Sequence, residues 1–182
     1  MKKNLLLAAL VIVAASSGCS SVEPTARSAS MAATGPKATA TLEPTKGNTA
    51  AGTVTFQQQG DQVVVTAKLS GLKPNQEHGF HAHEKGDCSS GDGMSTGGHF
   101  NPTAKAHGPQ DAEHHAGDMP GLKSDAGGNV DAKFNLTGVG IGSGSADLVG
   151  RGLIVHAAAD DYKTQPTGNS GARIACGVIR QG

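Results

Sequence analysis

Two histidines within a short apolar run give the clearest chemical signal in the sequence. His81 and His83 alternate with Phe80 and Ala82. In a β-strand this alternation places both imidazoles on one face, about 7 Å apart along the chain. Because imidazole is the commonest metal ligand in proteins, two imidazoles on one face suggest a metal site. His78 falls on the opposite face, where a hydrogen-bonded core or loop histidine is the simpler interpretation.

A second set of metal-binding side chains lies in the polar, Gly-rich stretch 84–121. It contains His99, His107, His115 and Asp118, residue types that suit a tetrahedral zinc site with three imidazoles and one carboxylate. A long loop without a core of its own would gain order from such an ion. Loops of this length are usually functional or disordered, and the histidines favour function here.

A further histidine, His156, ends the apolar run 153–155, where it can return to the face that carries His81 and His83. Imidazole ligands without thiolate or thioether suit Cu(II) as well as zinc. The candidate ligands outnumber those that one ion needs, so two ions that share a ligand fit the count. The candidates are His81, His83, His99, His107, His115, Asp118 and His156.

The elements that must position these side chains are short β-prone runs. They cover residues 54–56, 63–65, 80–83, 130–136, 153–156 and 174–179, and turn signals such as Gly71 and Gly127-Gly128-Asn129 separate them. No amphipathic helical period is evident downstream of the N-terminal segment. The pattern therefore predicts an all-β sandwich or barrel with two long loops, 84–121 and 159–172.

Composition supports one domain with an aliphatic core. A length of 182 residues suits a single domain. With 27 Gly, 8 Pro, 3% aromatics and no Trp, the core must come from Val, Ile, Leu and Ala, and turns must be frequent. Fifteen basic and fifteen acidic residues cancel, so net charge recruits neither nucleic acid nor an anionic membrane surface.

The N-terminus has the pattern of an export signal. Lys2 and Lys3 precede the apolar run 5–15, which is too short to span a bilayer and leads into small residues. The segment Ser16-Ser17-Gly18-Cys19 resembles a bacterial lipobox, in which the cysteine carries the lipid. Ser16 stands where that pattern usually has Leu, so simple export with cleavage elsewhere remains an alternative.

These features divide the chain into three segments. We expect residues 1–18 to be a signal peptide, 19–37 to be a lipidated flexible tether rich in Ser, Ala, Thr and Pro, and 38–182 to be the folded domain. The expected location is the periplasm or cell envelope, with the protein attached to a membrane only through the lipid on Cys19.

The cysteines agree with export to an oxidising compartment. If Cys19 carries the lipid, Cys88 and Cys176 remain as an even pair, which predicts one disulfide. Two buried free thiols are the alternative.

Taken together, the motifs resemble the copper/zinc superoxide dismutases, in order and spacing, from about residue 38 to the end. The resemblance implies a Greek-key β-sandwich, or flattened barrel, with long metal-binding and electrostatic loops. The matching segments are 79–83, 98–102, 107–108, 115–118, 150–151, 156, 160–161 and 168–179.

The resemblance also implies one copper and one zinc ion per subunit. Copper would be bound by His81, His83, His99 and His156, and zinc by His99, His107, His115 and Asp118, with His99 bridging the two ions as an imidazolate. The interval from His107 to His115 is one residue shorter than in the eukaryotic pattern, and His114 offers a competing imidazole. His115 is preferred because its distance from Asp118 matches the family.

Three further residues have roles implied by the resemblance. Asp160 would link a copper histidine to a zinc histidine and fix their orientation. Arg173 corresponds to the active-site arginine, whose permanent charge can hold a small anion beside copper. Lys163 would add to the positive electrostatic field that steers superoxide, although a solvated loop lysine is an equally good interpretation.

The activity implied is disproportionation of superoxide to dioxygen and hydrogen peroxide, with His99 detaching from Cu(I) to carry a proton. A non-catalytic copper or zinc binder would lack copper ligands or the arginine, and a copper-only dismutase would lack the zinc ligands. We expect superoxide as the substrate, no nucleic-acid partner, and a homodimer in slight preference to a monomer.

Overall fold

The computed structural model describes residues 34–182. In this part the regular structure is strands and one short 3₁₀-helix, η1 (Met94–Thr96). None of the helices in the described part has the length and apolar character needed to cross a bilayer. The predicted signal peptide and the predicted lipid site at Cys19 lie outside the described residues.

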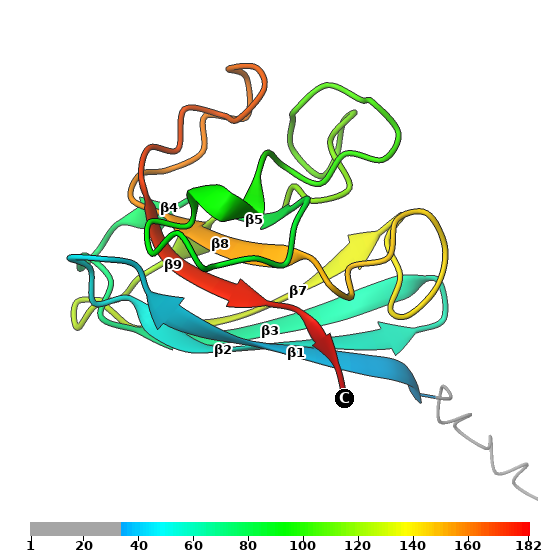
Figure 1. The fold of residues 1–182 in the computed structure, drawn as a ribbon, viewed down its shortest axis with the longest axis horizontal. Helices are drawn as coiled ribbons and strands as arrows, with labels where there is room; N and C mark the ends of the chain where they lie inside the picture. Colours follow the sequence, from blue (N-terminus) through cyan, green and yellow to red (C-terminus); the bar gives the residue numbers. More distant parts are fainter. Residues whose placement is uncertain (1–33) are drawn as a thin grey trace, which may run out of the picture. The chain divides into compact units, whose positions relative to one another are not determined.

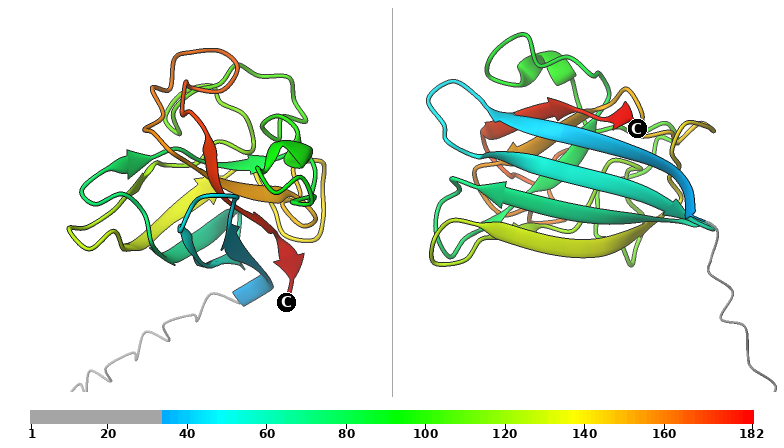
Figure 2. Two further views of the ribbon diagram at one scale, coloured as in Figure 1. Left: turned by 60° about the vertical axis from the view of Figure 1, so that its left-hand side comes forward. Right: turned by 90° about the horizontal axis from the view of Figure 1, so that it is seen from below.

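Most strands form one curled antiparallel sheet of eight strands (Figures 1 and 2). Its order is β5-β8-β9-β1-β2-β3-β7, and β10 also pairs with β1. The strands are β1 (Thr34–Pro44), β2 (Ala51–Gln59), β3 (Gln62–Ser70), β5 (Phe80–His83), β7 (Val130–Thr137), β8 (Gly152–His156), β9 (Arg173–Val178) and β10 (Arg180–Gln181). A separate two-stranded sheet pairs β4 (Glu77–His78) with β6 (Leu122–Lys123).

The sheet curls because β1 is shared by two layers. Most of β1 pairs with β2, whereas its last two residues, Glu43 and Pro44, pair with Cys176 and Ala175 of β9. Figure 1 shows β1, β2, β3 and β7 in one layer, with β5, β8 and β9 in the other. The predicted all-β fold of two packed layers is confirmed.

The core fills the space between the two layers. In β3 the buried residues Val63, Val65, Ala67 and Leu69 alternate with more exposed ones, as expected for a strand with one face in the core. By contrast, every residue of β5 and β8 is buried. These two strands therefore have a core face and a second face that other parts of the chain cover.

The first strand differs from the sequence-based expectation. Residues 34–37, assigned above to the tether, belong to β1, which starts before Ala38. The inward residues of β1 are Ala38, Ala40 and Leu42. Alanine is a weak strand former, which explains why this segment was absent from the predicted strands.

The two predicted long loops are present and cover the outer face of β5 and β8. The first runs from β5 to β6 and contains η1, and the second connects β8 to β9. The predicted disulfide between Cys88 and Cys176 is confirmed: it joins the first loop to β9, with Cα atoms 5.9 Å apart and a separation of 88 residues. A closed loop of that length stabilises the fold by about 4–5 kcal/mol in the chain-entropy model.

Candidate metal centre

Strands β5 and β8 bring three histidines together on their outer face. His81 and His83 come from β5, and His156 ends β8. The ring centroids of His81 and His156 are 4.9 Å apart, and those of His83 and His156 are 5.7 Å apart. Pairing of β8 with β9 shifts register between Val155 and His156, a local irregularity of the kind that re-aims a side chain.

A segment of the first loop adds His99 by pairing with the edge of β5. The Phe100 N–H donates to the Ala82 carbonyl over 2.9 Å, and the Glu84 N–H donates to the Gly98 carbonyl over 3.0 Å. The His99 ring stacks on His81 with centroids 4.0 Å apart. The four-histidine group consists of His81, His83, His99 and His156, whose candidate ligand atoms all lie within 4.8 Å of one another.

The same loop supplies a second group around Asp118. Asp118 Oδ1 lies 2.9 Å from His99 Nδ1 and 3.3 Å from His115 Nδ1, and its Oδ2 lies 3.0 Å from His107 Nδ1. The Asp118 group consists of His99, His107, His115 and Asp118, all buried and again within 4.8 Å of one another. His99 belongs to both groups and presents Nδ1 to this one.

The hydrogen bonds of His83 and His156 fit a cation bound in the four-histidine group. Nδ1 of His83 donates to the Gly97 carbonyl over 2.9 Å, and Nδ1 of His156 donates to the Gly171 carbonyl over 3.1 Å. Since a carbonyl only accepts, the other nitrogen of each neutral ring carries a lone pair. That tautomer is the one a metal ligand needs.

The remaining ring nitrogens converge without hydrogen bonds of good geometry. Within residues 34–182 these atoms are His81 Nδ1, His83 Nε2, His99 Nε2, His107 Nδ1, His115 Nδ1 and His156 Nε2. Of these, His107 Nδ1 and His115 Nδ1 face the Asp118 carboxylate, 3.0 and 3.3 Å away. Leaving a buried polar atom unsatisfied costs about 1–3 kcal/mol. A cation in each group would satisfy these atoms, so the residues present fit two metal ions.

Asp160 connects the two groups. Its Oδ2 accepts from His81 Nε2 over 2.6 Å, and its Oδ1 accepts from His107 Nε2 over 2.9 Å. Both bonds are buried. One carboxylate therefore orients an imidazole of each group.

The electrostatic environments of the two groups differ. Burial lowers the pKa of His81 to about 4 and that of His156 to about 3, so these rings are neutral at pH 7. Burial also acts to lower the pKa of His107, but its close contacts with the Asp118 and Asp160 carboxylates outweigh burial and raise the pKa to about 9.

Both carboxylates remain ionised. Burial acts to raise the pKa of each carboxyl, but close contacts with His107 and with a second histidine hold the pKa of Asp118 and of Asp160 well below the ordinary range. The Asp118 group thus contains an ionised carboxylate, whereas His81 and His156 of the four-histidine group are neutral rings.

Arg173 lies beside the four-histidine group at the start of β9. Its Nη1 donates to the Gly93 carbonyl over 2.7 Å and to Thr96 Oγ1 over 2.8 Å, and its Nη2 donates to the Gly97 carbonyl over 2.7 Å. The Gly97 carbonyl also accepts from His83. This shared acceptor fixes a permanent positive charge next to the histidines.

His78 and His114 belong to neither group. His114 Nδ1 donates to the Ala112 carbonyl over 2.8 Å, and of the adjacent pair only His115 joins the Asp118 group. His78 is buried, and its Nδ1 donates to the His156 carbonyl over 2.8 Å. The interpretation of His78 as a hydrogen-bonded histidine outside the metal face is therefore confirmed.

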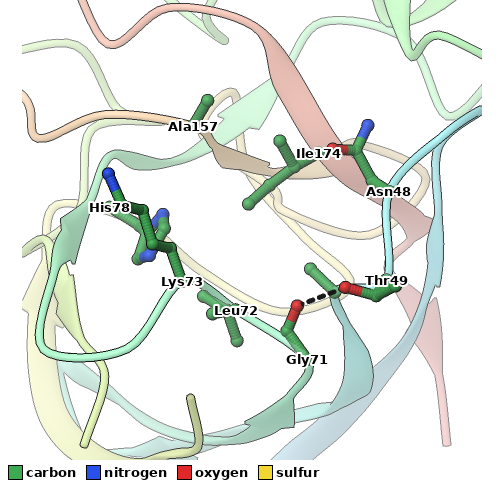
Figure 3. A pocket seen from close by; sticks show the side chains of 9 residues that line it. Asn48, Thr49, Gly71, Leu72, Lys73, His78, Ala157 and Ile174 are labelled. Carbon is green, nitrogen blue, oxygen red and sulfur yellow. Dashed lines mark hydrogen bonds between the residues drawn. The ribbon is translucent and has the colours of Figure 1, made fainter. Parts of the chain in front are cut away.

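The cavity in Figure 3 is also separate from the metal residues. It has a volume of about 360 Å³ and is lined by His78, Lys73, Asn48, Ile174 and neighbouring residues, none of which belongs to either group.

Two residues of the second loop that the sequence pattern did not indicate contact the Asp118 group. Gln165 hydrogen-bonds the main chain of His107, and the Tyr162 ring lies parallel to the His107 ring. Polar and aromatic loop residues carry no periodic signal, so only the folded structure reveals these contacts. Lys163 is exposed, and its N–H donates to Asp161.

The family model described as copper/zinc superoxide dismutase matches residues 50–179, a segment that includes every residue of both groups. The chain belongs to the copper/zinc superoxide dismutase family. This dismutase is similar to two proteins of Aquifex aeolicus (strain VF5). Superoxide dismutase (Cu-Zn) 2 is 43% identical over 123 residues, or 65% of this chain and 72% of the relative. Superoxide dismutase (Cu-Zn) 1 is 41% identical over 128 residues, or 68% and 76%.

A solved structure of similar fold is that of the clock protein EA4. It superposes on the dismutase with a TM-score of 0.72 and 39% identity, covering 79% of this chain and 93% of that one. Family membership and the two ligand groups give the activity: the dismutase disproportionates superoxide and uses one copper and one zinc ion.

Proposed function

We propose which residues bind each ion in this dismutase. The four-histidine group holds copper, the Asp118 group holds zinc, and His99 serves both. The observation that carries this assignment is the convergence of ring nitrogens without hydrogen bonds of good geometry in two groups that share one residue. Neutral nitrogen ligands suit copper, and three imidazoles with one carboxylate suit zinc.

Copper held by the four-histidine group would supply the electron exchange with superoxide, and zinc, which has no redox chemistry, would supply none. The chain supplies the proton handling. Nδ1 of His99 contacts Asp118 within the Asp118 group, and the other ring nitrogen, Nε2, faces the four-histidine group. Nε2 is therefore the atom at which a proton is held and passed to the reduced oxygen.

Arg173 binds the substrate anion in this proposal. Three hydrogen bonds to the segment around η1 fix its guanidinium, so little side-chain entropy is lost when superoxide docks. Its charge persists through the reaction because arginine stays protonated.

The test compares superoxide disproportionation by the copper- and zinc-loaded protein with that of His156→Ala. We expect His156→Ala to lose activity together with its copper, and His114→Ala, which alters a histidine outside both groups, to retain activity. Full copper content and full activity in His156→Ala would contradict the assignment.

We also propose that the protein is exported to the periplasm or cell envelope, anchored by a lipid on Cys19, and protects the envelope from superoxide. The basic start and short apolar run support export, and the Cys88–Cys176 disulfide suits an oxidising compartment. Intact-mass analysis of the mature protein and of Cys19→Ser tests the lipid, with simple export as the alternative outcome. From the family resemblance alone we propose a homodimer, and light scattering of the purified protein tests it.

A further inference from the structure

The loop between β8 and β9 closes onto the pair formed by Asp160 and His107. The Gly168 N–H donates to the Thr164 carbonyl over 2.7 Å, which folds the loop back on itself. At Gly168 an added Cβ would collide with Asp160 Oδ1 and lie 2.5 Å from His107 Nε2. The loop backbone is thus fitted directly against a histidine of the Asp118 group.

Gln165 of this loop pairs with the main chain of His107. The His107 N–H donates to Gln165 Oε1 over 2.8 Å, and Gln165 Nε2 donates to the His107 carbonyl over 2.8 Å. A primary amide carries an acceptor and donors side by side, so it can satisfy the N–H and C=O of one residue together. The two bonds join loops that are 58 positions apart in the sequence.

Tyr162 approaches the same histidine from its ring face. Its ring lies at 5° to the His107 ring with centroids 6.5 Å apart, and its hydroxyl accepts from the Gly121 N–H over 2.8 Å. The Tyr162 N–H donates to Asp160 Oδ1 over 2.7 Å. Tyr162 makes these contacts at a φ of 54°, a left-handed conformation that is uncommon for residues other than glycine and tends to mark functional sites.

We propose that Gln165 and Tyr162 are positioning residues that hold His107 in the orientation needed to retain zinc. This inference rests on the proposed zinc ligands. The side chains of both residues act on His107, whereas the Gly97 and Gly171 carbonyls orient His83 and His156. Losing these side chains therefore affects the retention of zinc more than that of copper.

The experiment measures the release of zinc and of copper from the fully metallated protein into a chromogenic chelator. Gln165→Ala is compared with Gln59→Ala, which removes an exposed glutamine of β2. We expect zinc to leave Gln165→Ala about 10- to 100-fold faster, the usual effect of losing a residue that supports a metal ligand. Copper should leave both variants at the wild-type rate.

Two more variants separate positioning from a general folding defect. Gln165→Glu should not rescue zinc retention, because a carboxylate can accept from the His107 N–H but faces the His107 carbonyl with no donor. Tyr162→Phe keeps the ring and loses one hydrogen bond, so its zinc release should rise less than that of Gln165→Ala. Cobalt(II) placed in the zinc site should show altered visible bands in Gln165→Ala.

Two results would overturn the inference. One is equal zinc release from Gln165→Ala and Gln59→Ala. The other is faster release of both metals together with a lower melting temperature of the metal-free variant, which indicates general destabilisation. The assignment of the zinc ligands fails by a different result, unchanged zinc affinity in His107→Ala, so the two failures are distinguishable.

Discussion

Three of the four residues in the four-histidine group lie on β5 and β8, whereas the Asp118 group lies entirely in the loop that follows β5. Strand pairing aligns the first set through backbone hydrogen bonds that form with or without an ion. The second set is aligned by contacts among charged side chains and by the neighbouring loop. One fold thus holds a site built mainly on paired strands, with His81 and His156 uncharged, beside a loop site built around the ionised Asp118, and His99 belongs to both.

Removing that common member should break both sites at once. We expect His99→Ala to reduce the rate of disproportionation by about 10²- to 10⁴-fold, the range typical for loss of a proton-transfer group. The substitution should also lower the affinity for both metal ions. Metal content by mass spectrometry and activity at matched protein concentration check this. His78→Ala is unsuitable as a control because His78 contacts His156, so His114→Ala is used. Retention of both metals and full activity in His99→Ala would refute the shared role.

Replacing Asp160 should separate the two sites. Asn has one acceptor oxygen where the carboxylate has two. The Asn side chain in Asp160→Asn can therefore accept a hydrogen bond from only one of His81 and His107. We expect zinc affinity to fall by about 10- to 100-fold and copper affinity to fall less, because carbonyls orient His83 and His156 independently. Competition titrations with chelators measure both constants. A larger fall in the affinity for copper than in that for zinc would contradict this expectation.

Proton release on metal binding should sharpen the contrast. With its pKa at about 9, His107 is protonated at pH 7 in the metal-free protein and must lose a proton to zinc. His81 and His156, with pKa values of about 4 and 3, have no proton to lose to copper. Calorimetric titrations in two buffers of different ionisation enthalpy should give about one proton from His107 when zinc binds and none from His81 or His156 when copper binds; the proton that His99 loses as it becomes a ligand of both ions is counted separately.

The smallest expected effect is on the stability of the metal-free protein. Histidines with lowered pKa bind fewer protons folded than unfolded between about 4 and 6.5, so the unfolding free energy falls as pH drops through that range. His107 has a raised pKa, so its contribution is complete below 6.5 and is lost as pH rises through about 9. Urea unfolding should therefore show maximal stability near pH 6.5, and a steady rise from pH 6.5 to 9 would contradict these directions.

Much of the candidate site could be predicted from the sequence because it depends on local geometry. The period of two along 80–83 places His81 and His83 on one face whatever the surroundings, and the excess of ligands in 84–121 points to a second ion. Where the local signal was weak, prediction failed. The alternating alanines of β1 did not predict a strand, and packing against β2 and β9 is what makes it one.

The sequence by itself therefore determined which residue types bind the metals, that His81 and His83 share one face of a strand, and that Cys88 and Cys176 form a pair. Only the tertiary structure decided that one Gly97 carbonyl serves both His83 and Arg173, and that Gln165 and Tyr162 contact His107. These contacts join residues far apart in the chain. They depend on how two loops close over the sheet, and no local period in the sequence encodes that closure.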